Sequence, residues 1–154
     1  FDGVFSNFSG LNCVEDLAGT ARSLARLIRH RANLLLCVST RYCLLEIAHY
    51  AVKGDLHRAF RRCKGIAQVG LEGHSLPVHY PTLRSMRNWF APMFRLRGVT
   101  GIGVSVPPSY LEAWMQTHPG VLRKCEAIDR LLSRWPGARV IGDHMLLHLE
   151  KGAP

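Results

Sequence analysis

The sequence lacks long apolar runs. The longest ones, such as residues 34–38, are far too short to cross a bilayer. It also lacks a charged-then-apolar leader with a small-residue cleavage site, and it has no initiator Met. We therefore expect a cytoplasmic protein without a membrane span, and a chain that is cut out of a longer one.

Cysteine is scarce and odd in number, and no two of the five residues form a CxxC pair. The cysteines are Cys13, Cys37, Cys43, Cys63 and Cys125. This pattern argues against a disulfide framework and against a zinc site. We predict buried thiols and no bound metal.

Acidic residues are also few, because 11 Asp and Glu stand against 20 Lys and Arg, which gives the 154-residue chain a net charge of +9. Most of the excess is Arg, with clusters in residues 22–31 and 53–64. We interpret these clusters as solvated helix faces and do not expect nucleic acid as the partner. The alternative is a non-enzymatic basic α/β module that binds nucleic acid or another acidic partner, and it requires one continuous basic face.

The composition of the sequence, with 47% apolar and 20% charged residues, is typical of a folded domain. It opens with a β-prone segment at residues 3–8, which stops at turn-forming Ser, Asn and Gly. Residues 14–29 have helical spacing, and residues 33–39 form a second apolar strand. This order predicts a βαβ unit of a parallel sheet, with residues 6–10 at the carboxyl end of a strand, where ligands bind.

The later segments alternate between helices and strands. The predicted helices cover residues 41–64, residues 83–91 after an N-cap at Thr82, and residues 109–135, where Ser109 is the expected cap. A small hairpin or loop is expected at residues 65–77. Strands are expected near residues 94–106 and 139–150.

Several blocks of the sequence resemble class I S-adenosylmethionine-dependent methyltransferases. FDGVFSNFSGLNCVEDL and LARLIRHRANLLLCVS are similar to the fourth strand, the following helix and the fifth strand of that family. The blocks VHYPTLRSMRNWFAPMFRL, GIGVSVPPSYLEAW and GDHMLLHLE resemble the distal part of one bacterial branch. The resemblance covers nearly the whole chain. It implies an α/β fold, the distal half of a Rossmann-like methyltransferase sheet, with parallel strands, an antiparallel terminal strand and helical insertions.

The family's glycine-rich cofactor loop, and the acidic residue after its second strand, have no counterpart in this sequence. The resemblance therefore implies that residues 1–154 are a partial methyltransferase domain. We expect this piece to be inactive on its own. We also expect it to self-associate through the bare edge of its first strand.

The resemblance also implies a cofactor, S-adenosylmethionine. Ser6, Asn7 and Phe8 would line its methionine and sulfonium end, and Ser9 and Gly10 would shape the turn. From the residues alone, an ordinary polar turn between a strand and a helix is the simpler interpretation. The family resemblance favours the binding turn.

Methyl transfer needs no catalytic triad, because substitution at a sulfonium disperses charge and correct positioning can supply roughly 7–11 kcal/mol of the barrier. Glu46 and His49 share a helix face and are candidates for polarising an acceptor, and a hydrogen-bonded pair is the alternative. A single E-x-x-H motif does not make a di-iron site. His144 is a further candidate, and pairing with Asp143 is its alternative.

Four aromatic residues are candidates for the wall of a small apolar or aromatic acceptor: Tyr42, Tyr80, Tyr110 and Trp114. Aromatic residues at helical spacing belong more often to the core. Gly101 and Gly103 imitate a dinucleotide fingerprint but lack its third glycine, which argues against a nicotinamide-dependent oxidoreductase. We expect these glycines to mark a bulge or a close backbone approach.

Overall fold

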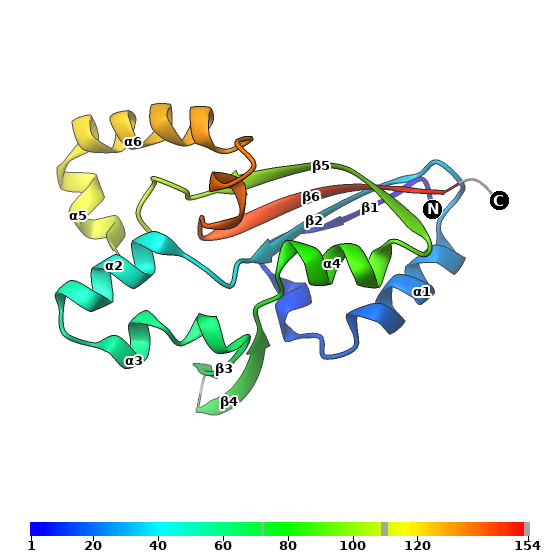
Figure 1. Cartoon of the computed structure of the whole chain (residues 1–154), viewed down its shortest axis with the longest axis horizontal. Coiled ribbons are helices and arrows are strands. Elements are labelled where there is room, and N and C mark those ends of the chain that lie inside the picture. The colour runs from blue at the N-terminus through cyan, green and yellow to red at the C-terminus, as the bar shows by residue number, and fades with distance from the viewer. Residues whose placement is uncertain (72, 109–110, 153–154) are drawn as a thin grey trace.

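A four-stranded sheet forms the centre of the computed structural model, which describes residues 1–71, 73–108 and 111–152 (Figure 1). Across the sheet the strands are β1 (Gly3–Ser6), β2 (Asn33–Ser39), β6 (His144–Lys151) and β5 (Phe94–Ile102). β1 is parallel to β2, and β6 is antiparallel to both β2 and β5. β1, β2 and β5 therefore point the same way, and their carboxyl ends lie at one end of the sheet. Parallel strands with an antiparallel terminal strand confirm the predicted fold class.

Helices α1 (Leu17–Leu27) and α4 (Leu83–Phe90) cover one face of this sheet (Figure 1). Alternate residues of the strands point toward them, and burying each large apolar side chain contributes roughly 1.5–3 kcal/mol. The core between the helices and the sheet includes Leu17, Ala21, Leu34, Leu36, Val38, Met86, Phe90, Met145, Leu147 and Leu149. On the other face, the side chain of Phe5 is 68% exposed.

Both helices begin at a capping side chain. Asp16 Oδ1 accepts a hydrogen bond from the backbone N–H of Gly19 at 2.7 Å, and Thr82 Oγ1 accepts one from that of Ser85 at 3.1 Å. These bonds satisfy N–H groups that the first turn of a helix leaves without a partner. Thr82 is the N-cap that the sequence predicts.

β1 is shorter than the sequence predicts, since it ends at Ser6 rather than at residue 8. Phe8 and Ser9 have φ angles of 49° and 59°, which lie in the left-handed region and cannot continue a strand. A 3-10 helix, η1 (Gly10–Cys13), follows and delays the start of α1 to Leu17.

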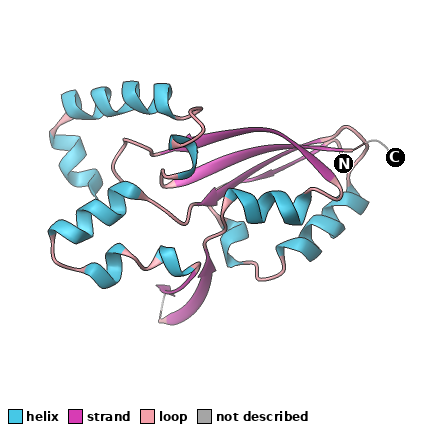
Figure 2. Cartoon of the chain, in the orientation of Figure 1, coloured by secondary structure: helices cyan, strands magenta, loops and turns pink. Residues whose placement is uncertain are grey.

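The segment between β2 and α4 is an insertion of short helices and a hairpin (Figure 2). It contains α2 (Leu44–Val52), α3 (Leu56–Ala59) and the 3-10 helix η2 (Arg62–Lys64). β3 (Ile66–Leu71) then pairs antiparallel with β4 (His74–His79). The helices fall within the range 41–64 in which the sequence places them.

A second insertion separates β5 from β6 and contains α5 (Glu112–Thr117), α6 (Pro119–Leu132) and the 3-10 helix η4 (Ala138–Val140). Both strands are shorter than predicted, because the chain leaves the sheet at Gly103, with φ of 65°, and returns only at His144. A Cβ at Gly101 would lie 2.7 Å from Arg139 Cα, so this glycine marks a close backbone approach. The predicted cap Ser109 lies outside the described residues.

The helices of the two insertions gather beyond the carboxyl ends of β1, β2 and β5, on the left of Figure 1. They therefore surround the end of the sheet at which ligands of α/β proteins bind. Within the described ranges, no helix has both the length and the apolar character that crossing a bilayer requires.

All five cysteines are free thiols. Cys37 and Cys43 are buried, and burial raises the pKa of both thiols. Cys13 is exposed at the end of η1, so the prediction of buried thiols is wrong for this residue.

Candidate functional site

The turn at residues 6–10 follows β1 and lies beside the end of β2. Ser9 Oγ and Ser39 Oγ share a hydrogen bond of 2.9 Å, which joins the turn to β2. Ser6 and Ser9 are half-buried, whereas the other turn residues are exposed, Phe8 to 90%. A Cβ placed on Gly10 would meet no atom within 4 Å. The turn is thus open backbone that a ligand can approach.

Asn12 holds this end of the sheet together. Its buried side chain donates from Nδ2 to the carbonyl oxygens of Ser39, at 3.2 Å, and His79, at 2.6 Å. Its Oδ1 accepts from the backbone N–H of Ser39 at 3.0 Å. One amide therefore joins the turn after β1 to the ends of β2 and β4. The sequence analysis missed Asn12, although a polar side chain between Leu11 and Cys13 was an available signal.

A buried network of charged side chains joins the first insertion to the sheet. Glu46, on α2, is 1% exposed, and its carboxylate accepts from Arg61 Nε at 2.9 Å and from Arg62 Nη2 at 2.5 Å. Arg62 Nη2 is also 2.8 Å from Asp143 Oδ1, directly before β6. Because Arg62 contacts two carboxylates, the network links α2, η2 and the last strand.

The charges in this network stabilise one another. Burial opposes the charged form of Arg62, but the two carboxylates outweigh it and raise the pKa of the guanidinium. Burial likewise works to raise the pKa of the Asp143 carboxyl, but the hydrogen bond from His144 and the charge of Arg62 hold that pKa below its usual value. The Arg62 guanidinium also lies over the ring of Tyr80, 5.3 Å from its centroid.

Two of the three candidate catalytic residues, Glu46 and His144, belong to the same chain of charged contacts, through Arg62 and Asp143. Glu46 is satisfied by two arginines, which corrects its assignment as a group that faces an acceptor. His49 lines a cavity of about 380 Å³ together with Pro107 and Pro108. His144 Nδ1 is 3.2 Å from Asp143 Oδ2, so His144 and Asp143 form the pair that the sequence offered as an alternative.

Cys43, Glu46 and Asp143 bring one potential ligand atom each to within 4.8 Å of the others. Arg62 Nη2 contacts both of these carboxylates and already supplies the positive charge that they require. The cluster is therefore an ion-pair network rather than a metal site.

Of the four candidate aromatic residues, the three that the structure describes lie in different surroundings. Tyr80 is 5% exposed and packs on Arg62, which corrects its assignment to an acceptor wall. Trp114 stacks on the ring of His118 at 4.5 Å between centroids. Tyr110 lies outside the described residues. Tyr42 is half-exposed and lines a cavity at the end of β2.

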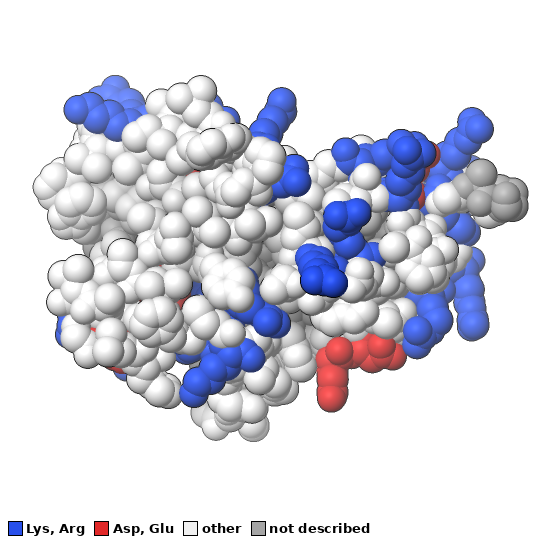
Figure 3. Space-filling model, in the orientation of Figure 1, with Lys and Arg blue, Asp and Glu red and all other residues white. Residues whose placement is uncertain are grey.

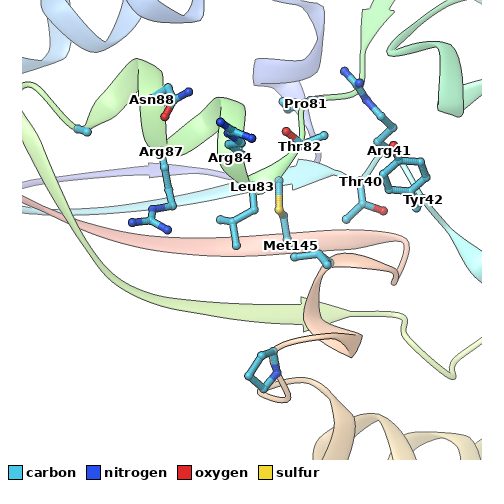
Figure 4. A pocket seen from close by; sticks show the side chains of 13 residues that line it. Thr40, Arg41, Tyr42, Pro81, Thr82, Leu83, Arg84, Arg87, Asn88 and Met145 are labelled. Carbon is cyan, nitrogen blue, oxygen red and sulfur yellow. The ribbon is translucent and has the colours of Figure 1, made fainter.

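This cavity has a volume of about 640 Å³ and opens between the end of β2 and the first turns of α4 (Figure 4). Thr40 and Tyr42 line it on one side, Leu83 on another, and Met145 of β6 forms part of its floor. Thr40 directly follows Ser39, which bonds to the turn. The cavity and the turn therefore contact neighbouring residues at the carboxyl end of β2, although no residue of the turn lines the cavity.

The two basic clusters are largely engaged with carboxylates. The ion pairs are Arg22–Asp16, Arg29–Asp2, Arg58–Asp55, Arg61–Glu46 and Arg62–Glu46. Arg62 is buried, so it contributes nothing to an outer basic face.

We predict that Asn12→Ala lowers the free energy of unfolding by about 2–3 kcal/mol, because it leaves buried backbone groups of Ser39 and His79 without a partner. Asn7→Ala is the matched control, since Asn7 is exposed in the same turn. We expect it to cost less than about 0.5 kcal/mol. Urea unfolding of both variants measures the difference. Equal losses of unfolding free energy would contradict the inference that Asn12 holds this end of the sheet together.

The lowered pKa of Asp143 predicts a pH-dependent contribution to stability. Its ionised form contributes above the unfolded-state pKa of about 3.9, and the contribution is lost as the pH falls through the lower folded-state pKa. We expect Asp143→Asn to destabilise the protein by about 2–4 kcal/mol at pH 7 and to lose less stability than wild type between pH 5 and the acid transition.

Asp2→Asn is the control for this prediction, since Asp2 pairs with Arg29 at an exposed site. Urea unfolding at several pH values measures all three proteins. Parallel stability curves for wild type and Asp143→Asn would show that this carboxylate is not the acid-sensitive group.

No protein-family model matches the sequence, and no curated protein matches it at a significant level. Solved structures do match. The crystal structure of an S-adenosylmethionine-dependent methyltransferase from Mesorhizobium loti has 13% identity and a TM-score of 0.52, and the match covers 97% of this chain and 61% of that one. A structure assigned to the same class, from Listeria monocytogenes, has 10% identity and a TM-score of 0.60, with 99% and 62% covered.

The chain spans about three fifths of the length of these two structures. The low identity means that the likeness concerns the fold, and it covers nearly all of this chain. Together with the parallel β1–β2 pair and the antiparallel terminal strand, it shows that the chain has the fold of class I S-adenosylmethionine-dependent methyltransferases.

Proposed function

We propose that residues 1–154 form the distal part of an enzyme that transfers a methyl group from S-adenosylmethionine to a small acceptor. The observation that carries this proposal is the open turn at residues 6–10, at the carboxyl end of a strand that is parallel to its neighbour. Ligands of open α/β sheets bind at such ends. The solved structures that share the fold are described as methyltransferases, which supports the same activity.

The turn fits the methionine end of this cofactor. Backbone carbonyls at the end of β1 can accept hydrogen bonds from its ammonium group, and the hydroxyls of Ser6 and Ser9 add further polar contacts. Asn7 and Phe8 stand at the open side of the turn, and the free space at Gly10 lets a ligand approach the backbone. When bound, S-adenosylmethionine supplies a methyl group on a cationic sulfur.

In this proposal the adenosine end is held by residues outside this chain, because the chain spans about three fifths of the length of the methyltransferase structures. Residues 1–154 alone therefore bind the cofactor poorly and lack activity. This accounts for a methyltransferase sheet in a sequence without a glycine-rich loop.

The residues of this chain position the acceptor rather than activate it. The cavity beside the turn offers Tyr42, Leu83 and Met145 to an apolar or aromatic body. Holding such a body in line with the methyl group can supply roughly 7–11 kcal/mol of the barrier. Where the acceptor must lose a proton, a base is also needed. Of the sequence-derived candidates, His49 and His144 line other cavities than this one.

We predict that Gly10→Val weakens S-adenosylmethionine binding at least about tenfold in the full-length protein. A Cβ at Gly10 meets no atom of the described residues within 4 Å, so the added side chain extends into space that the proposal gives to the cofactor. Gly70→Val is the matched control, because a Cβ at Gly70, in the β3–β4 hairpin, also meets no atom within 4 Å.

Calorimetry of cofactor binding to wild type and both variants provides the measurement. Unchanged affinity in Gly10→Val, or equal losses in the two variants, would refute the placement of the cofactor at this turn. Tight binding by residues 1–154 alone would refute the need for further residues.

We further predict that residues 1–154 alone self-associate through the edge of β1. Within the described part of the chain this edge strand pairs only with β2, and Phe5 and Phe8 are exposed on and beside it. We expect Phe5→Lys to reduce association in sedimentation velocity runs over a range of concentrations. Leu131→Lys on α6, which also replaces an exposed apolar side chain, should leave it unchanged, and the reverse result would place the contact elsewhere.

A further inference from the structure

Three arginines surround the 640 Å³ cavity beside the turn, although its inner surface is mainly apolar. They are Arg41, from the segment after β2, and Arg84 and Arg87, from α4. No Asp or Glu belongs to the lining that the described residues provide.

Arg84 and Arg87 are exposed, and neither forms an ion pair within the described ranges. They lie three residues apart on α4 and therefore share a helix face, where like charges repel each other. Arg41 is held in place, because its Nε donates to the carbonyl oxygen of Tyr80 at 2.9 Å. An anion at this cavity would relieve the repulsion and complete the charge balance.

On the face shown in Figure 3, the acidic side chains lie away from α4. On the face of the molecule shown in Figure 3, Lys and Arg side chains lie over α4, whereas the largest group of Asp and Glu lies below it, near the start of α1. In Figure 4, Arg84 and Arg87 stand on the α4 side of the cavity, opposite the strand that carries Met145. Arg84 and Arg87 thus lie on the α4 side of the cavity, and Met145 lies on its floor.

The size and the chemistry of the cavity together select a class of ligand. About 640 Å³ is the volume of a small-molecule site, and it is too small for a polymer. Guanidinium groups form strong charge-assisted hydrogen bonds to carboxylates and phosphates. Tyr42, Leu83 and Met145 suit an aromatic or short aliphatic body.

We propose that this cavity binds a small amphipathic anion, with a carboxylate or phosphate group held by Arg84 and Arg87 and an apolar body against Leu83 and Met145. The further step, that this anion is the methyl acceptor, rests on the proposed function and on the adjacency of the cavity to the turn across Ser39 and Thr40. Binding of the anion itself does not depend on methyl transfer.

The test measures binding of benzoate, phenyl phosphate and the neutral benzyl alcohol to the purified full-length chain by calorimetry. We expect at least one anion to bind at least about tenfold more tightly than benzyl alcohol. The better of the two anions identifies the charged group as carboxylate or phosphate. Equal affinity for all three probes, or no binding of either anion, overturns the proposal.

The double variant Arg84→Gln/Arg87→Gln is expected to lose at least about tenfold in affinity for the anion. Arg26→Gln/Arg123→Gln removes the same charge from exposed positions on α1 and α6 and should bind like wild type. Equal losses in the two double variants would reduce the effect to net charge and overturn the proposal.

A second measurement on wild type does not depend on the folding of any variant. Phenylglyoxal modifies accessible arginines, and mass spectrometry locates the modified residues. Bound anion should protect Arg84 and Arg87 and leave Arg26 and Arg123 reactive. Protection of all four, or of none, contradicts the proposal.

Cofactor binding, measured on the full-length protein rather than on residues 1–154 alone, separates this proposal from the proposed function. Anion binding that depends on Arg84 and Arg87, without S-adenosylmethionine binding, supports the anion site and refutes the methyltransferase. Cofactor binding without anion binding refutes the anion site and supports the methyltransferase.

Discussion

A buried amide must have its hydrogen bonds made, and at Asn12 this requirement holds the end of the sheet in one arrangement. Its side chain meets the backbone of Ser39 twice and that of His79 once, so the ends of β2 and β4 are fixed relative to the turn after β1. The proposed cofactor turn and the cavity beside it both depend on this point. Ser39 bonds to the turn and Thr40 lines the cavity, so these two neighbouring residues link the two features.

The insertion between β2 and α4 is attached by charge rather than by apolar packing alone. Glu46 could not be buried without its arginines, and Arg62 reaches both Glu46 and Asp143. Because Asp143 directly precedes β6, the same arginine that fixes α2 also fixes the start of the last strand. The two insertions and the sheet therefore meet at one guanidinium, which explains why so basic a chain buries one of its arginines.

Sequence reasoning succeeded where local pattern determines structure. The turn-forming residues after Phe5, the helical spacing of α1 and the N-cap Thr82 are all short-range signals, and the parallel β1–β2 pair follows from them. It failed where distant segments decide. The end of β1 depends on positive φ at Phe8 and Ser9. The burial of Glu46 depends on Arg61 and Arg62, which lie 15 and 16 residues away in the chain. Tyr80 looked like a ligand wall because its cation partner could not be identified from spacing.

The position of β6 imposes an order on assembly. This strand follows all the others in sequence, yet it lies between β2 and β5 and pairs with both. Until β6 has emerged from the ribosome, β5 has no place in the sheet and β2 keeps an open edge beside the growing chain. The sheet is thus incomplete while the two insertions are being synthesised. Its central pairings form only once residues 144–151 are free to pair with β2 and β5.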